Sequence, residues 1–181
     1  MLRQFREIGK DLFLSGLVTS HAGNMSMRTG SRLIITRRGS MLGRLKAADL
    51  VDVTVSSPHS ADHLASSELP IHRAIYDKTA AMAVIHAHPA HAVALSLLTD
   101  TISPPDLEAS YLLGRIPVVE AKLSVVSSEA PNLVALALRE AKVVVLRGHG
   151  SFAVGEHLEE ALHWSSVLEH SCRIAYLLGR S

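Results

Sequence analysis

The sequence predicts a single α/β domain of three layers, in which helices cover both faces of a central sheet. Segments with a helical period and segments with a strand pattern are mixed along the chain, without strict alternation of strand and helix. The 181 residues suffice for one hydrophobic core, and 48% of them are hydrophobic against 19% charged. No repeat, low-complexity tract or linker divides the sequence, so we expect one domain over residues 1–181.

The first third of the chain predicts one helix and three strands. Apolar residues at three- and four-residue steps predict an amphipathic helix over residues 1–18. Two short strands, at 24–28 and 32–36, are joined by Thr29-Gly30-Ser31, which is typical of a hairpin turn. The alternating segment 51–55 predicts a third strand.

The remaining two thirds of the chain mix helices and strands. The polar segment 58–67 predicts a loop, and Ser66 or Ser67 is expected to cap a helix that begins near Glu68, with Pro70 tolerated in its first turn. Beyond this helix, apolar runs and helical periods predict the other elements. We expect strands at 82–88, 116–120, 143–147 and 151–155, and helices at about 90–98, 131–141 and 157–178.

Composition and charge exclude several classes of function. The formal net charge is only +1, and no basic run or aromatic-basic cluster suggests a nucleic-acid partner. The lone cysteine, Cys172, excludes an intramolecular disulfide and a cysteine-rich zinc site. The N-terminal segment lacks the apolar core of a signal peptide, and no apolar stretch is long enough to span a membrane. We therefore expect a cytoplasmic protein with neither nucleic-acid nor membrane partners.

Three of the 11 histidines stand where a metal site needs them. His86 and His88 end a predicted strand two residues apart, and residues i and i+2 of a strand project from the same face. His149 follows another apolar strand, and the glycines on either side of it allow a sharp turn and close access. A catalytic zinc site commonly takes three protein ligands and leaves one position open. These histidines are therefore candidate ligands of one divalent metal.

The spacing of these residues is also compatible with purely structural roles. His86 and His88, taken as a pair, fit a structural role about as well as a functional one. His91 lies on the helix that follows and is expected to support the site or cap polar groups. Glu68 at a helix start is favoured by the helix dipole, which requires no catalytic function. His21 and His63 could lie near the cleft. Together with these two, the remaining histidines are interpreted as surface or helix residues: His21, His59, His63, His72, His157, His163 and His170.

Four segments together resemble the class II aldolase/adducin family, and specifically its L-fuculose-phosphate aldolase-like members. The segments occur in the family's order, and the resemblance covers nearly the whole domain. They are HAGNMSMR (21–28), SSELPIHRAIY (66–76), AVIHAHPAH (83–91) and LRGHGSFAVG (146–155). For the fold, the resemblance implies a central sheet that is mainly antiparallel.

The resemblance also implies the composition of a metal centre. His86, His88 and His149 match the metal ligands, with Zn²⁺ expected and Mn²⁺ or Co²⁺ as alternatives. Glu68 matches an acidic residue that ligates the resting metal and then serves as general acid/base. The resemblance thus gives Glu68 a catalytic role that its position in the sequence does not.

A phosphate pocket is the second site that the resemblance implies. Asn24 matches a residue that contacts phosphate, and Gly39, Ser66 and Ser67 match the other parts of the pocket. Hydroxyls, backbone N–H groups and a helix start are suited to holding an anion.

Two features near this pocket depart from the family's pattern or match it only loosely. The family's Thr-Pro-Thr-Gly-like turn is here Thr36-Arg37-Arg38-Gly39. Arg38 could hold a phosphate or carboxylate with its guanidinium, or could be a solvent-exposed turn residue. Tyr111 lies roughly where the family has a tyrosine proton donor and is a candidate for that role.

The activity that the resemblance implies is a metal-dependent aldol cleavage. A short ketose 1-phosphate, similar to L-fuculose 1-phosphate, would yield dihydroxyacetone phosphate and an aldehyde such as lactaldehyde through a metal-stabilised enediolate. A sugar-phosphate epimerase, a methylthioribulose-phosphate-type dehydratase or a decarboxylase on the same metal site is the alternative. A noncatalytic interaction module is a third hypothesis, which the intact histidine triad and Glu68 argue against. The family also implies a homotetramer with active sites between subunits.

Overall fold

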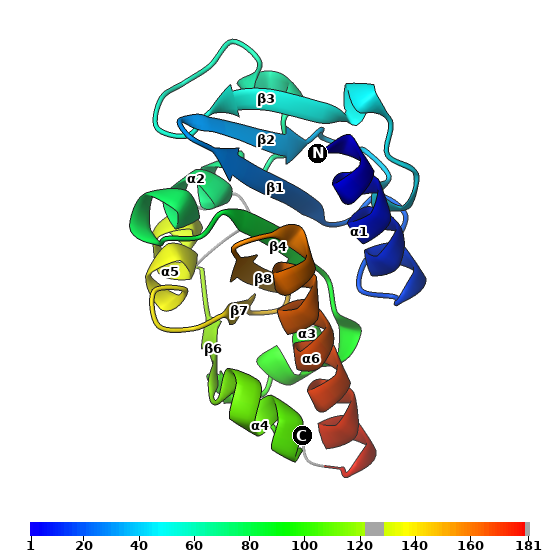
Figure 1. Cartoon of the computed structure of the whole chain (residues 1–181). Coiled ribbons are helices and arrows are strands. Elements are labelled where there is room, and N and C mark those ends of the chain that lie inside the picture. The colour runs from blue at the N-terminus through cyan, green and yellow to red at the C-terminus, as the bar shows by residue number, and fades with distance from the viewer. Residues whose placement is uncertain (122–128, 180–181) are drawn as a thin grey trace.

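The computed structural model describes residues 1–121 and 129–179 of the chain (Figure 1). The helices are α1 (Leu2–Leu14), α2 (Leu69–Lys78), α3 (Ala90–Ser96), α4 (Leu107–Leu113), α5 (Ala130–Ala137) and α6 (Leu158–Leu177). The strands are β1 (Asn24–Thr29), β2 (Arg32–Thr36), β3 (Leu50–Thr54), β4 (Ala83–Ala87), β5 (Thr101–Ile102), β6 (Ile116–Val119), β7 (Val143–Leu146) and β8 (Gly150–Gly155). Short 3-10 helices are η1 (Leu42–Arg44), η2 (Ala47–Asp49) and η3 (Asp62–Leu64).

The described strands form one sheet of eight, in the order β3-β2-β1-β4-β8-β7-β6-β5. Every neighbouring pair is antiparallel except β6 and β7, which are parallel. Helices α1, α3 and α6 lie on one side of the sheet and α2 and α5 on the other (Figure 1). The predicted three-layer α/β domain with a mainly antiparallel sheet is therefore confirmed.

Alternation along β4 divides the core into two clusters. Ala83 and Ile85 face the helices α1, α3 and α6, whereas Val84 faces α2 and α5. All three side chains are fully buried, as expected for a central strand covered on both faces. His86 follows Val84 at a spacing of two and therefore projects toward the α2 side.

Several predicted boundaries are wrong by a few residues. The first helix ends at Leu14 and not at residue 18, because Gly16 adopts a φ of 73° and turns the chain. Leu17 and Val18 are nevertheless buried, so the spacing of apolar residues continues beyond the end of the helix. The helix predicted over 131–141 spans Ala130–Ala137.

The sequence did not reveal the short elements between α3 and β6. Strand β5 has only two residues, too few for a recognisable alternation. Helix α4 has seven residues and is started by Asp106, whose side chain accepts a hydrogen bond from the Ala109 N–H. The loop predicted over 58–67 also contains the 3-10 helix η3.

The helix start beside Glu68 differs from the expectation. Glu68 itself occupies the N-cap position of α2, so neither Ser66 nor Ser67 is the cap residue. The Ser66 hydroxyl instead accepts a hydrogen bond from the Glu68 N–H at 3.3 Å. The Glu68 side chain forms no capping hydrogen bond with α2 and points into the pocket instead. In the described part of the chain, none of the helices is long and apolar enough to cross a membrane.

Candidate metal centre

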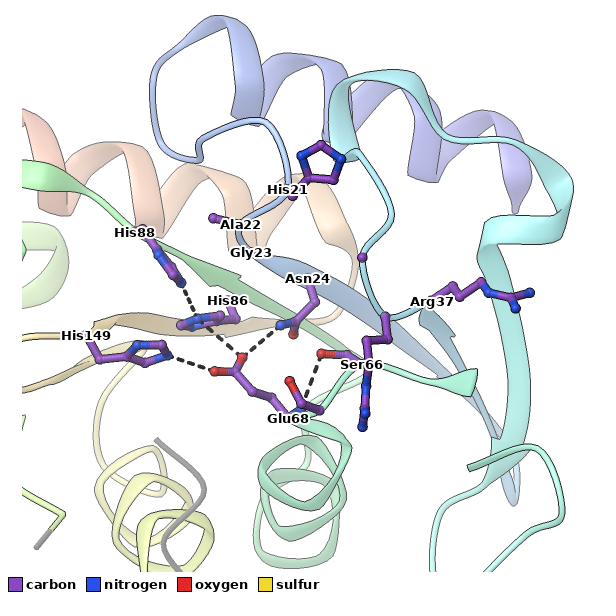
Figure 2. A pocket seen from close by; sticks show the side chains of 13 residues that line it. His21, Ala22, Gly23, Asn24, Arg37, Ser66, Glu68, His86, His88 and His149 are labelled. Atoms are coloured by element: carbon purple, nitrogen blue, oxygen red, sulfur yellow. Dashed lines mark hydrogen bonds and ion pairs between the residues drawn. The ribbon is translucent and has the colours of Figure 1, made fainter. Parts of the chain in front are cut away.

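The candidate site lies where the start of β1, the end of β4, the start of β8 and the start of α2 meet. Asn24 begins β1, His86 and His88 lie at the end of β4, and His149 precedes β8. These residues line a cavity of about 200 Å³ together with Glu68 (Figure 2). A cavity of this size suits a small ligand rather than a polymer.

The structure brings His86, His88 and His149 together, as the sequence predicts. One ligand atom from each ring lies within 4.8 Å of those of the other two. The Nε2 atoms of His86 and His88 are 2.8 Å apart. Such convergence of three imidazole nitrogens fits the donor set of a divalent transition-metal site with an open position.

His86 is held in the protonation state that a metal ligand requires. Its Nδ1 donates a hydrogen bond to the Ser151 carbonyl oxygen at 3.0 Å, which places the ring proton on Nδ1. Burial lowers the pKa of His86 to about 3, so the ring is neutral at pH 7 and Nε2 carries a lone pair. Burial also lowers the pKa of His88.

The carboxylate beside His86 gives a test of whether a cation fits. The lone pair on His86 Nε2 faces the Glu68 Oε2 atom at 3.2 Å. Neither atom has a proton to share when His86 is neutral and Glu68 is ionised, so the two lone pairs repel each other. A divalent cation bound between them would turn this repulsion into two attractions, and the residues therefore fit such an ion.

The two glycines around His149 have separate geometric roles. Gly148 adopts a φ of 67°, which lets the chain turn sharply between β7 and β8. Gly150 lies against the end of β4, where a Cβ atom would come within 2.4 Å of the Ala87 carbonyl oxygen and 2.9 Å of His86 Cε1. The sharp turn predicted from the Gly-His-Gly pattern is present, and Gly150 in addition allows β8 to lie close to the end of β4 beside His86.

Glu68 reaches into the same cluster from the start of α2 (Figure 2). Its Oε1 atom lies 2.8 Å from His149 Nε2, and its Oε2 atom accepts a hydrogen bond from Asn24 Nδ2 at 2.8 Å. Burial by itself raises the pKa of Glu68, but attraction to His86 and hydrogen bonds from His149 and Asn24 outweigh it and lower the pKa to about 2. Because His86 is itself neutral, we attribute the ionised state of Glu68 to the two hydrogen bonds.

His72 belongs to this site, although its place in the sequence suggested an ordinary surface or helix residue. It is fully buried and contacts Asn24 and Ser26, and burial lowers its pKa to about 4. A signal was present in the sequence, because His72 follows Glu68 by four residues and therefore shares its face of α2.

All five predicted phosphate residues line the same cavity, and one of them, Asn24, is bonded to Glu68. Arg38 and Gly39 lie in the turn after β2, and Ser66 and Ser67 lie just before α2. The Arg38 side chain is exposed, and its backbone N–H is bonded to the Leu64 carbonyl oxygen at 3.0 Å. This backbone bond joins the turn after β2 to the segment before α2, and residues of both line the cavity.

Two further residues of this region lie at the pocket, and three candidates do not. Arg37 and His21 line the cavity, whereas the His63 ring pairs with the Ser60 carbonyl oxygen away from it. The Nδ1 atom of His91 lies 2.7 Å from Oε1 of Glu169 on α6, so this pair joins α3 to α6. Tyr111 lies on α4, is 86% exposed and does not line the pocket of its own chain.

Comparison with known proteins identifies the family. Residues 3–176 match the class II aldolase and adducin N-terminal domain. The chain belongs to the class II aldolase/adducin family. Its membership accounts for the mainly antiparallel sheet and for the position of the histidine cluster, and it makes the protein an enzyme of the class II aldolase superfamily with a histidine site suited to a divalent metal.

Members of this family with different activities are similar to the chain. A crystal structure of L-fuculose-1-phosphate aldolase from Thermus thermophilus has a TM-score of 0.94 and 40% identity, covering 98% of this chain and 93% of that one. A 3-oxo-tetronate 4-phosphate decarboxylase from Pectobacterium atrosepticum is 29% identical over 96% of this chain and 82% of its own length. A probable bifunctional methylthioribose-1-phosphate isomerase/methylthioribulose-1-phosphate dehydratase from Nocardia farcinica is 30% identical over 94% of this chain, which spans 34% of that longer protein.

Proposed function

We propose that the protein is a metal-dependent aldolase that cleaves a short ketose 1-phosphate similar to L-fuculose 1-phosphate. The products are dihydroxyacetone phosphate and an aldehyde such as lactaldehyde. The observation that carries the proposal is the position of Glu68, whose carboxylate lies between His149 and His86 of the histidine cluster. The similarity to the Thermus aldolase over both chains supports this choice of reaction.

His86, His88 and His149 would hold the metal, which we propose to be Zn²⁺, with Mn²⁺ or Co²⁺ able to fill the same donor set. A bound divalent metal supplies a Lewis acid that polarises the substrate carbonyl and stabilises the negative charge that develops as the C3–C4 bond breaks. A zinc site with three protein ligands leaves a position for substrate oxygen.

Glu68 is the proposed acid/base of the reaction. In the cleavage direction it delivers a proton to C3, and in the condensation direction it removes that proton. His149 Nε2 can donate to Glu68 or ligate the metal, but not both. When His149 Nε2 serves as ligand, its hydrogen bond to Glu68 Oε1 is lost.

The phosphate is expected at the end of the cavity lined by Ser66, Ser67 and Gly39. Arg38 lines the same cavity, and Asn24 lies beside Glu68. The guanidinium of Arg38 offers paired donors to a dianion, and the serine hydroxyls offer neutral ones. A phosphorylated substrate thereby spans the cavity with its phosphate at one end and its carbonyl at the histidines.

Tyr111 can act in this scheme only from another subunit, because it is exposed and does not line the pocket of its own chain. We propose that it donates the proton to the aldehyde oxygen during condensation. This role requires the expected homotetramer, in which active sites lie between subunits. The partners of the chain are then a small sugar phosphate and further copies of itself.

A second candidate function is decarboxylation or dehydration on the same metal site. The similarity to the Pectobacterium decarboxylase and the Nocardia bifunctional protein favours it, and Arg37 and Arg38 are suited to a carboxylate as well as a phosphate. A sugar-phosphate epimerase uses the same charge stabilisation. All these reactions need proton transfer beside a polarised carbonyl, so Glu68 would keep its role.

A substrate panel on zinc-loaded protein tests the proposal. Dihydroxyacetone phosphate is incubated with small aldehydes to detect condensation. Phosphorylated acids and ketoses are assayed for decarboxylation, dehydration and epimerisation. Condensation with lactaldehyde, abolished in Glu68→Gln while the metal is retained, is the expected result. Activity only in a decarboxylation, dehydration or epimerisation assay would replace the aldolase by the second candidate, and full activity of Glu68→Gln would remove Glu68 from the mechanism.

A further inference from the structure

A buried chain of hydrogen bonds runs from Glu68 into the interface between α2 and the sheet. Glu68 Oε2 accepts from Asn24 Nδ2 at 2.8 Å, and Asn24 Oδ1 lies 2.5 Å from His72 Nε2. On the far side of the ring, His72 Nδ1 lies 2.6 Å from Ser26 Oγ, which is 2.8 Å from the Tyr76 hydroxyl. All five side chains are buried, so these groups must satisfy one another.

The direction of each hydrogen bond follows from the carboxylate. An ionised Glu68 only accepts, so Asn24 must turn its NH₂ toward Glu68 and its carbonyl oxygen toward His72. That oxygen needs a donor, which fixes a proton on His72 Nε2. A second proton on Nδ1 would make a buried cation whose nitrogens both face neutral groups. The neutral ring therefore accepts at Nδ1 from Ser26, whose oxygen in turn accepts from Tyr76.

The arrangement depends on two pairs of residues at matching spacings. Glu68 and His72 are one helical turn apart on α2, and Asn24 and Ser26 are two residues apart on β1. The helix pair therefore faces the strand pair, and Asn24 bonds to both members of the helix pair. A rotation of the Asn24 amide by half a turn would place its oxygen against Glu68 and its NH₂ against the His72 donor.

We propose that His72 is a positioning residue, held as its Nε2–H tautomer, that fixes the Asn24 amide and through it the Glu68 carboxylate. The inference rests on the proposed role of Glu68 as acid/base. With the amide fixed, Glu68 Oε2 is oriented by Asn24 while Oε1 stays directed at His149. Ser26 and Tyr76 act one step further out, by supplying the proton that keeps His72 Nδ1 an acceptor.

Two substitutions separate positioning from packing. His72→Gln places an amide N–H near the position of Nε2 and keeps a donor to Asn24. His72→Phe fills a similar volume without any donor. We expect kcat of His72→Phe to fall about 10- to 100-fold, with bound zinc and KM little changed, because loss of a partner that orients an active-site group typically costs that much. His72→Gln should recover most of kcat.

Equal loss of kcat in both variants, or no loss in either, would overturn the proposal, since a packing role makes no distinction between a donor and an isosteric carbon. Thermal unfolding is measured on both, so that a general loss of stability is recognised. The kinetic arm uses whichever substrate of the panel the protein turns over. Its outcome therefore does not depend on the aldolase assignment.

A spectroscopic measurement tests the tautomer without any substrate. Long-range ¹H–¹⁵N correlation on the zinc-loaded protein distinguishes Nε2–H, Nδ1–H and doubly protonated rings, and the signals of His72 are those missing from His72→Gln. We expect a neutral Nε2–H ring. A Nδ1–H or doubly protonated ring would refute the inference even if the aldolase assay succeeds, and the expected tautomer would stand even if that assay fails.

Discussion

Asn24 of β1 and His86 of β4 are directly opposite each other in an antiparallel strand pair. Opposed residues of such a pair project from the same face, so this register alone places the amide beside the candidate metal ligand. Both side chains reach Glu68 Oε2, Asn24 at 2.8 Å and His86 at 3.2 Å. A slip of one residue would turn one of them to the opposite face of the sheet. The pairing of β1 with β4 therefore builds the site as much as the histidine spacing does.

Removal of a single histidine ligand is expected to abolish metal binding. His86→Ala takes away the buried nitrogen whose lone pair is fixed by the bond to Ser151, and two remaining ligands do not hold zinc tightly. We expect the metal content measured by mass spectrometry of purified protein to fall from one ion per chain to near zero. His163→Ala, which removes an exposed histidine of α6, is the control and should keep the ion. Full metal content in His86→Ala would refute the ligand assignment.

A methyl group at residue 150 is expected to disrupt the same centre without touching a ligand. The added Cβ of Gly150→Ala would meet the Ala87 carbonyl oxygen at 2.4 Å and His86 Cε1 at 2.9 Å, so β8 must move away from β4. We expect a loss of about 1–3 kcal/mol in the free energy of unfolding and weaker zinc affinity.

The neighbouring residue offers a matched control for this change. Ser151 has a buried hydroxyl with no hydrogen-bond partner in the described part of the chain, and it holds His86 through its backbone carbonyl. Ser151→Ala should therefore leave zinc affinity unchanged and stability equal or slightly higher. Denaturant unfolding and zinc titration of both variants provide the measurement. Equal behaviour of the two would show that the contact between β4 and β8 does not set the ligand geometry.

How far the site could be foreseen differs between its residues. His86, His88 and His149 were predictable because each is fixed by local spacing at a strand end, a pattern that needs no knowledge of the tertiary structure. The spacing of His72 from Glu68 shows only that the two share a helix face; its burial arises when α2 packs on β1 and brings it to Asn24 and Ser26.

The fold shows the same division between local and tertiary information. The hairpin of β1 and β2 was predicted, and the strands pair as expected, with Ser26 opposite Ile35, although Thr29 belongs to β1 and the turn is only Gly30-Ser31. Helix α4 and strand β5 were not predicted, since seven and two residues are too short for a hydrophobic period to emerge. The predicted end of α1 is wrong because Leu17 and Val18, which lie in the loop after the helix, pack in the core and so extend the apolar pattern.

Arg38 is expected to contribute to substrate affinity rather than to the chemical step. Arg38 is exposed and lines the cavity, as do Ser66 and Ser67, with which the phosphate is proposed to bind. Loss of one charge-assisted hydrogen bond costs about 1.5 kcal/mol or more, so Arg38→Ala should raise KM roughly tenfold while kcat changes little. Arg32→Ala removes a cation that is paired with Asp52 outside the cavity and serves as the control. An unchanged KM would mark Arg38 as an ordinary turn residue.

Acid is expected to destabilise the metal-free protein through its buried histidines, and His72 gives the clearest test. Its pKa is lowered from 6.5 to about 4 by burial, so below pH 6.5 the unfolded chain binds a proton that the folded chain does not. The free energy of unfolding should therefore be flat above pH 6.5 and fall toward pH 4, by at most about 1.4 kcal/mol per pH unit for each such histidine. Glu68, whose pKa is lowered from 4.5 to about 2, loses its stabilising contribution only below pH 4.5.

The window between pH 4.5 and 6.5 therefore isolates the histidines from Glu68. Urea unfolding of chelator-treated protein is measured at several pH values in this window, for the original chain and for His72→Gln. Glutamine does not titrate, so the variant should show a shallower fall in the free energy of unfolding while its value above pH 6.5 is constant. Identical slopes would mean that His72 takes up its proton as readily in the folded chain as in the unfolded one. Its ring would then be charged at acidic pH, and the single direction of hydrogen bonding from Tyr76 to Glu68 would not survive acidification.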